Sequence, residues 1–368
     1  MAAATRKKTG GITLLSSDLT TALLTVSPAV PSRAPKPILT NVRLGDGLVT
    51  GTDLEVRIDA AIDYHGDAIL LPHGRLLAIM QASSGEEVTL THDGTKCVVR
   101  CGSGTWTLPT EDAAEFPIWE PVDAKPITRL PADQLARAIR GVGYAVDGES
   151  SRYALGAVLL EVQGEKVTFV ATDGRRLSIA EMEHDLAVDD SATLVASRLA
   201  SIVSKFAHAV GDEGVQIDAT SSEVIFEIGT TTVTGRLVDG RFPRWRDAAP
   251  EHDVEPTTVT AEQLLSATRA AAVVTSEQSK GVDYTFTAEG IHLHGQSSEA
   301  GESSVTCEIV EAGHACTVKL DPIFVREWLT GLPADGEPTV SIQAKDHLSA
   351  VVMKTDTFTG VIMPLAKD

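Results

Sequence analysis

The sequence predicts an α+β protein made of three tandem copies of one module, in which two helices pack on antiparallel sheet. The first observation is a weak repeat, because helix, strand pair, helix and strand run recur in this order roughly every 120 residues. The second is that segments with helical periodicity alternate with β-branched segments bounded by Asp-Gly or Glu-Gly turns. The third is a Phe-Pro pair that closes the first two copies, at Phe116-Pro117 and Phe242-Pro243.

The helices are expected at equivalent places in the three copies. The first helix is predicted over residues 17–30, 132–146 and 261–275, and the second over residues 73–82, 197–210 and 321–330. Apolar residues recur at helical spacing in these segments, as at Leu135, Ile139 and Val142.

Strands are expected between the helices. Residues 167–172 alternate in strand fashion, and residues 215–218 and 224–228 flank a Ser-rich turn. The strand pair carries Thr52-Asp53-Leu54 in the first copy and Thr172-Asp173-Gly174 in the second. An open sheet edge can pair with another strand, so we expect the modules to continue edge to edge and to close a ring with a second chain.

The predicted domains are a loose basic tail at residues 1–11 and three modules at residues 12–125, 126–252 and 253–368. Linkers rich in Pro and charge are expected at residues 121–130 and 247–259.

No apolar run approaches the roughly 18 residues of a membrane span, and no hydrophobic run follows the basic start, which disfavours a signal peptide. The cysteines lack ligand spacing, and Cys97 and Cys101 should be buried free thiols on one strand face. We expect a cytoplasmic protein without a metal or other cofactor.

The net charge of −20 argues against nucleic-acid binding only if the charge is evenly spread. The six predicted helices hold seven Lys or Arg against five Asp or Glu, so the helices carry +2 and the remainder −22. Four of the five acids lie in a first turn, where the helix dipole favours them. The helix bodies are therefore basic. This pattern is expected of a surface that faces DNA, but it is equally typical of ordinary solvated helix faces.

A set of landmarks resembles one known family, the bacterial DNA polymerase III β sliding clamps. The landmarks are residues 37–39 with 50–55, 151–159 with 171–177, 240–243, and 361–365. Each is weak alone, but they occur in order and span nearly the whole chain. The resemblance implies a head-to-tail homodimeric ring with pseudo-sixfold symmetry, three domains per chain, helices lining the hole and sheets outside.

By the same resemblance the function is that of a non-catalytic processivity factor that encircles duplex DNA and tethers the replicative polymerase, the clamp loader and other proteins. Its location would be the nucleoid in the cytoplasm. Matching positions imply DNA contacts at Arg33, Arg137, Tyr153, Arg198 and Lys205.

The family holds its partners through a short peptide that enters a pocket between the second and third domains. The matching pocket residues come from four parts of the chain: Leu155, Thr172, Gly174, Arg175, Arg176, Leu177, Pro243, Asp247, Ala248, Val361, Ile362, Met363, Pro364 and Leu365. Their apolar members suit peptide anchors, although Leu155, Leu177 and Val361 are equally typical of an ordinary core.

The matching dimer-interface residues are Arg75, Trp106, Val273, Val274, Glu299 and Glu302. Three departures from the family stand out. Residues 103–105 are neutral where basic residues are common, Asp247 replaces a basic residue, and Ser279 stands where an aromatic residue can occur. These departures leave open weaker ring closure and a preference for less acidic peptides.

Two other classes of function compete. An enzyme is disfavoured because the sequence has no G-x-S-x-G elbow, P-loop, HExxH motif or GxGxxG segment after a strand. His292 and His294 share one probable strand face but lack a third spaced metal ligand. The alternative that stays open is a divergent clamp-like interaction scaffold, a paralogue or phage-encoded form with altered ring closure or partner choice.

Overall fold

The computed structural model describes residues 11–119, 123–148, 153–184, 186–211, 213–275, 281–333 and 338–366. Arg6 to Lys8 of the predicted basic tail lie outside these residues. Contacts divide the chain into two compact units, Met1–Pro126 with Glu213–Arg236 and Ile127–Asp212 with Leu237–Asp368. The division follows the sheets and cuts through residues 126–252, so the three predicted domain ranges stay a prediction.

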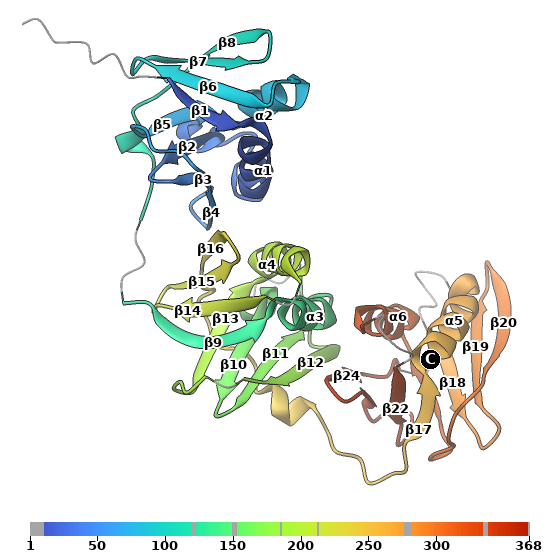
Figure 1. The fold of residues 1–368 in the computed structure, drawn as a ribbon. Coiled ribbons are helices and arrows are strands. Elements are labelled where there is room, and N and C mark those ends of the chain that lie inside the picture. Colours follow the sequence, from blue (N-terminus) through green and yellow to red (C-terminus); the bar gives the residue numbers. More distant parts are fainter. Residues whose placement is uncertain are drawn as a thin grey trace, which may run out of the picture. The chain divides into compact units, whose positions relative to one another are not determined.

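The first unit contains helices and two antiparallel sheets (Figure 1). Its elements are β1 (Ile12–Leu15), α1 (Ser16–Val26), η1 (Ser27–Ala29), η2 (Pro37–Thr40), β2 (Asn41–Gly45), β3 (Leu48–Thr52), β4 (Val56–Ala61), β5 (Ile69–Pro72), α2 (His73–Ala82), β6 (Glu87–His92), β7 (Lys96–Cys101), β8 (Gly104–Pro109), η3 (Ala113–Glu115), β14 (Gly214–Ala219), β15 (Glu223–Ile228) and β16 (Thr231–Arg236). One sheet has the order β1-β6-β7-β8, and the other runs β5-β2-β3-β4-β16-β15-β14, with β9 (Lys125–Pro131) as its last strand.

The second unit has the same plan. After β9 (Lys125–Pro131), its elements are α3 (Ala132–Gly143), η4 (Tyr153–Gly156), β10 (Ala157–Gln163), β11 (Lys166–Thr172), β12 (Arg176–Glu183), β13 (Ser191–Ala196), α4 (Ser197–Val210), η5 (Trp245–Ala248), β17 (Thr257–Thr260), α5 (Ala261–Ala271), η6 (Ala272–Val274), β18 (Val282–Phe286), β19 (Ile291–Ser297), β20 (Gly301–Cys307), β21 (Thr317–Leu320), α6 (Pro322–Gly331), β22 (Thr339–Gln343), β23 (Val351–Lys354) and β24 (Phe358–Ile362). One sheet has the order β13-β10-β11-β12-β24-β23-β22-β17, and the other β20-β19-β18-β21.

The repeats join edge to edge, as the sequence predicted. Each long sheet contains two three-strand meanders that meet at their last strands, β4 with β16 and β12 with β24. Both junctions are antiparallel, with Arg57 opposite Thr234 in one and Leu177 opposite Val361 in the other. Two meanders, β6-β7-β8 and β18-β19-β20, end instead on an edge strand of a four-stranded sheet.

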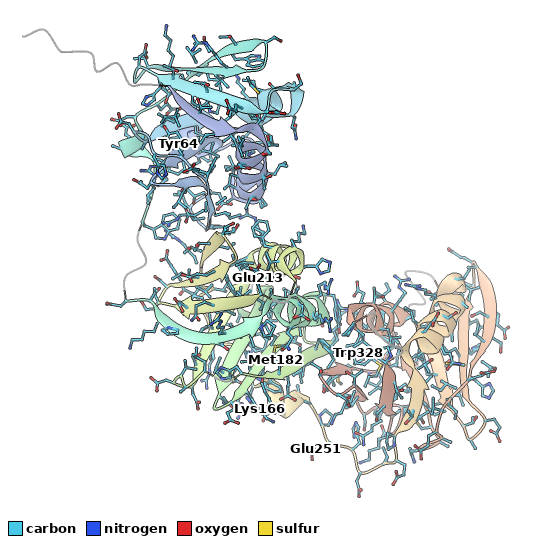
Figure 2. The ribbon with its side chains drawn as sticks, viewed as in Figure 1. Tyr64, Lys166, Met182, Glu213, Glu251 and Trp328 are labelled. Atoms are coloured by element: carbon cyan, nitrogen blue, oxygen red, sulfur yellow. The ribbon has the colours of Figure 1, made fainter. Side chains whose placement is uncertain are left out.

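The helices cover one face of each sheet. The Ser178 hydroxyl on β12 donates to the Gly141 carbonyl of α3 at 2.7 Å, which fixes this helix on that face. The Ser204 hydroxyl of α4 in turn donates to the Ala136 carbonyl of α3 at 3.2 Å. The core is aliphatic with a few large side chains, of which Tyr64 in the first unit and Trp328 in the second are fully buried (Figure 2).

The helix predictions are confirmed within a few residues, and the second helices at 73–82 and 197–210 match α2 and α4. The first helices end sooner than predicted, at Val26, Gly143 and Ala271, because α1 and α5 close with a 3₁₀ turn. Pro28 ends α1, since its missing N–H cannot continue the helix. The linker predictions were wrong in part, because β9 begins within residues 121–130 and β17 begins within residues 247–259.

The four cysteines are free thiols, and Cys97 and Cys101 are buried on β7 as predicted. Burial raises the pKa of the Cys97 and Cys307 thiols from 9.0 to about 11. The folded-state pKa lies above the unfolded value, so folding favours the neutral thiol. This stabilisation is fully present below pH 9.0 and is lost as the pH rises through about 11.

We therefore expect the free energy of unfolding, measured in urea, to fall as the pH rises between those values. A chain carrying Cys97→Ala and Cys307→Ala is expected to lose less stability over the same interval, because it has no thiol to ionise at either position. Equal pH slopes for the two proteins would contradict this.

Candidate functional site

The turn between β11 and β12 lies at the centre of the predicted peptide pocket. Gly174 has φ +84°, a left-handed conformation that suits glycine, and its N–H donates to the Thr172 hydroxyl at 3.1 Å. The Asp173 carboxylate accepts from the backbone N–H groups of Arg175 and Arg176 at 2.9 and 3.0 Å. Asp173 is thus a turn residue, and the exposed Gly174 and Arg175 form the tip of the turn.

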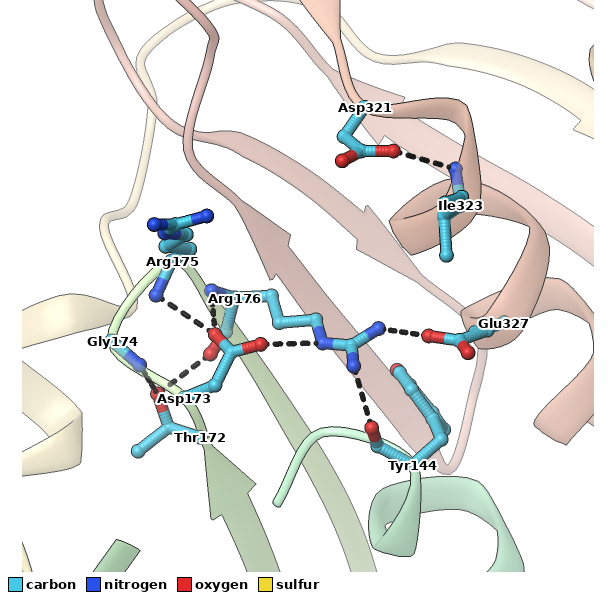
Figure 3. Close-up of polar contacts among 9 residues, drawn as sticks. All are labelled: Tyr144, Thr172, Asp173, Gly174, Arg175, Arg176, Asp321, Ile323 and Glu327. Atoms are coloured by element: carbon cyan, nitrogen blue, oxygen red, sulfur yellow. Dashed lines mark hydrogen bonds and ion pairs between the residues drawn. The ribbon is translucent and has the colours of Figure 1, made fainter. Parts of the chain in front are cut away.

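Arg176 was predicted to line the pocket, but its side chain is held inside the unit (Figure 3). Its Nε donates to Asp173 at 2.9 Å, one terminal nitrogen donates to Glu327 of α6, and the other donates to the Tyr144 carbonyl at 2.6 Å. The guanidinium also stacks over the Phe324 ring at 4.4 Å. Burial raises the pKa of the Tyr144 phenol beside it, so this ring stays neutral. Arg176 therefore links β12 to α6 through its guanidinium, whereas the side chain of Arg175 is exposed.

Two apolar members of the predicted pocket, Leu177 and Val361, belong to one cluster on the sheet face opposite α3. Leu177 and Val361 are directly opposite on β12 and β24, and they are 4% and 3% exposed. The cluster also contains Ala157, Leu159, Val170, Ile179, Leu194, Trp245, Ala350 and Val352, with Ala154, Val238, Phe242 and Ala249 packed against it. Leu177 and Val361 are thus core residues in this structure, whereas Leu155 is half-buried.

The tail after β24 lies beside the turn. The Met363 N–H donates to the Arg175 carbonyl at 2.9 Å, and the Leu365 N–H donates to the Lys319 carbonyl at 2.8 Å. Met363 is 47% exposed, which is unusual for so large an apolar side chain. A flexible thioether beside an exposed arginine can accommodate ligands of different shape.

Along β10 and β13 the structure shows a groove that the sequence did not reveal. It has a volume of about 560 Å³ and is lined by Leu159, Glu161, Ala192, Leu194 and residues 240–247. Only Pro243 and Asp247 of the predicted pocket belong to it. The one signal in the sequence was the spacing of Arg241, Arg244 and Arg246, which alternates with apolar residues.

The predicted DNA contacts of the second unit lie on two packed helices. Arg198 and Lys205 are exposed on α4, and Arg137 of α3 lies 3.5 Å from Asp133 in a half-exposed ion pair. Lys205 also lines a hollow of about 340 Å³ between the helices, together with Arg140 and His208. This helical surface is therefore basic, as the charge distribution predicted.

The remaining predicted residues are dispersed or lie outside the described residues. Arg33 is exposed in the first unit, between η1 and η2. The side chain of Tyr153 and the whole of Ser279 lie outside the described residues, so their contacts stay predictions. Among the described residues no group of three or more His, Cys, Asp or Glu could hold a metal ion, and no helix is long and apolar enough to cross a membrane.

Two of the predicted interface residues lie on the edge strands β8 and β20, whereas Arg75 lies in α2 and Val273 and Val274 lie in η6. Trp106 lies on edge strand β8, and Glu302 lies on edge strand β20. Val273, in η6, is 78% exposed, the largest exposed fraction among the large apolar side chains described. His294 contacts Glu302 at 3.0 Å on the surface of β19 and β20, consistent with a surface rather than a metal-binding histidine.

Comparison with known proteins identifies the family. Residues 12–120 match the N-terminal domain of the DNA polymerase III beta subunit, and residues 129–244 match its central domain. The beta sliding clamp of Synechococcus elongatus is 28% identical over 95% of this chain and 97% of its own, and that of Escherichia coli K12 is 24% identical over 92% and 95%.

Solved structures agree on the fold. A sliding clamp of Pseudomonas aeruginosa bound to griselimycin superposes with a TM-score of 0.90 at 22% identity, covering 98% of this chain and all of that one. The Bacillus subtilis DNA polymerase sliding clamp gives a TM-score of 0.90 at 21% identity over 98% of this chain. With both domain models matched and relatives aligned along nearly its whole length, the chain belongs to the DNA polymerase III beta subunit family, the beta sliding clamps.

Proposed function

We propose that this DNA sliding clamp, which is a processivity factor and not an enzyme, encircles duplex DNA as a head-to-tail homodimer and holds its partners through the pocket around Gly174 and Met363. The family implies partnership with DNA and a polymerase. The observation that carries the ring is that β8 and β20, each the last strand of a three-strand meander, lie at sheet edges and pair with no other meander among the described residues.

The internal junctions suggest how these edges pair. Each repeat has a first meander, which follows its first helix, and a second meander, which follows its second helix. In both junctions the last strand of a first meander (β4 or β12) pairs with the last strand of a second meander (β16 or β24). Two strands have no such partner in the described chain: β20, which ends a first meander, and β8, which ends a second meander. A second copy supplies the missing partner for each, and two such junctions close the ring.

The same equivalence gives the register. Thr52, Thr172 and Gln296 are equivalent, because they pair with Arg57, Leu177 and Glu302 on the strand that follows. Glu302 therefore corresponds to Arg57 and Leu177, and Thr107 corresponds to Thr234 and Val361. Glu302 of one copy then lies opposite Thr107 of the other. In the same register Ser304 lies opposite Thr105, and Ser303 lies opposite Trp106.

Contacts on β20 support the equivalence of β20 and β12. The Ser303 hydroxyl donates to the Ala271 carbonyl at the end of α5 at 2.8 Å, as the Ser178 hydroxyl does to Gly141 at the end of α3. Ser303 therefore faces the helix side, and Trp106 opposite it would do so too. There the indole meets η6 of the other copy, where Val273 and Val274 are the apolar partners.

DNA binding follows from the helical surface. In the ring the basic residues of α3 and α4 would face the hole and attract phosphates without reading bases. The strongly acidic remainder of the chain repels DNA from the outside. A cytoplasmic location at the nucleoid is part of the same proposal.

The register gives a test by disulfide trapping. Thr105→Cys and Ser304→Cys in one chain place two exposed positions opposite each other across each junction, at the roughly 4.5–5.5 Å Cα separation that antiparallel pairs have and a disulfide accepts. We expect mild oxidation to give a covalent dimer with two cross-links, seen on a non-reducing gel.

The matched control combines Thr105→Cys with Thr306→Cys, which faces the same side two residues out of register. It should cross-link far more slowly. Equal trapping in both variants would contradict the register, and a protein that stays monomeric at micromolar concentration would favour the clamp-like scaffold. The scaffold alternative is supported by the neutral residues 103–105, which supply no charge to the junction.

A further inference from the structure

The groove along β10 and β13 has a chemistry of its own. Its floor is apolar, because Leu159 and Leu194 lie opposite each other on the two strands and Phe242 and Trp245 close the far side. Its volume of about 560 Å³ is large enough for several side chains of an extended peptide.

The rim is basic, although the chain as a whole carries −20. Arg246 binds Glu161 at 2.7 Å and stacks over the Trp245 ring at 4.2 Å, so it is held in place against the floor. Arg244 pairs with Asp247 at 3.1 Å, and both side chains are mostly exposed. The third arginine, Arg241, is exposed and has no hydrogen bond or ion pair with the described residues. The groove is lined by these three arginines and by two acids, Glu161 and Asp247, so its lining carries one positive charge in excess.

The groove is continuous with the predicted peptide pocket. Pro243 and Asp247 belong to both, and one apolar cluster contains Leu177 and Val361 beneath the pocket and Leu194 beneath the groove. A peptide that leaves the pocket across residues 243–247 therefore enters the groove directly.

The groove also faces away from the surface proposed for DNA. Ser178 faces α3, so its neighbour Leu177 and the rest of the apolar cluster lie on the opposite face of the sheet. A duplex that touches α3 and α4 cannot reach this face of the same sheet, which leaves a protein segment as the occupant.

From these contacts we infer that the groove binds an acidic segment with an apolar anchor, directly flanking the short peptide that the clamp holds in its pocket. Carboxylates of this segment pair with Arg241 and Arg244, because guanidinium groups bind carboxylates in a bidentate manner. The apolar side chain lies on Leu159, Leu194 and Phe242. The inference rests on the proposed peptide pocket and extends it, so that partners are distinguished by what flanks their core peptide.

The test measures peptide affinity by fluorescence anisotropy. The probe is the short clamp-binding peptide of the replicative polymerase, alone or extended at either end by Asp-Glu-Phe-Asp-Glu, by Ser-Ser-Phe-Ser-Ser or by Lys-Lys-Phe-Lys-Lys. We expect the acidic extension at one end to tighten binding about tenfold, the neutral one to add less, and the basic one to add nothing.

Two variants locate the gain. Arg241→Glu reverses the charge that has no partner among the described residues, and Ala192→Trp fills the groove from an exposed position on β13. Each should abolish the gain from the acidic extension while the short peptide binds as before. Arg129→Glu, the same charge change at an exposed position on β9, is the matched control and should keep the gain.

The outcomes separate the two proposals. If the wild-type chain does not bind the short peptide, the proposed pocket fails. If the short peptide binds but the acidic extension adds nothing, or its gain survives both variants, the groove inference is overturned. A single-stranded oligonucleotide that displaces the acidic extension and depends on Arg241 would also overturn it, because the groove would then be a nucleic-acid site.

Discussion

Trp106→Glu is expected to convert the dimer into monomers. In the proposed junction the indole is buried against Val273 and Val274 of the second copy, and both are apolar. The substitution removes a large aromatic anchor and places a charge where no described residue of β8 or η6 can pair with it. A loss of at least 3 kcal/mol, which is more than about a hundredfold in the dissociation constant, is expected from these terms.

The measurement is the solution mass over nanomolar to micromolar concentration, where the wild type should stay near twice 38.9 kDa. Trp106→Phe is the control, because it keeps the apolar contact and should keep the dimer. A Trp106→Glu protein with an unchanged dimer would refute the junction between β8 and β20, even if another interface held the copies together.

Arg176→Ala is expected to lower the free energy of unfolding by about 3 kcal/mol, because it removes the side-chain donor to the Tyr144 carbonyl and one of the three donors to the Asp173 carboxylate. It also removes the guanidinium that lies over the Phe324 and Tyr144 rings. The pair with Glu327 contributes less, since that carboxylate is 40% exposed and screened by water.

Arg175→Ala is the matched control, because the neighbouring arginine is exposed and offers only its backbone to the turn. It should change the unfolding free energy by less than about 0.5 kcal/mol, as surface substitutions do. It should instead weaken binding of the clamp peptide. Urea unfolding and peptide anisotropy of both variants measure the two effects, and equal stability losses would show that Arg176 does not join β12 to α6.

The repeat architecture was predictable because it rests on local patterns. Helical periodicity placed α2 and α4 correctly, and Asp-Gly turns marked the strand ends. The equivalence of Thr52-Asp53-Leu54 with Thr172-Asp173-Gly174 is real in three dimensions, since Leu54 has φ +79° where Gly174 has φ +84°. The left-handed backbone at Leu54 could not be predicted, because a leucine rarely adopts it.

The residues that meet at the site could be named from the family resemblance, but their packing could not be predicted from the sequence. Leu177 and Val361 do meet, as the resemblance implied, but their near-complete burial is a property of packing and not of sequence. Arg176 shows the same limit, because its partner Glu327 is 151 positions away and only the fold brings the two together. The groove beside Pro243 was missed for the same reason.

The most direct test of DNA encirclement uses the Thr105→Cys, Ser304→Cys chain. The reduced chain is diluted below the nanomolar range to free monomers, which are then concentrated on a nicked circular plasmid and oxidised. The complex is next washed in high salt to remove electrostatic binding. We predict that the cross-linked ring stays on the circular plasmid and leaves as soon as a restriction enzyme linearises it. Loss from the circle, or retention on the linear form, would contradict the proposal that this chain holds DNA by encircling it.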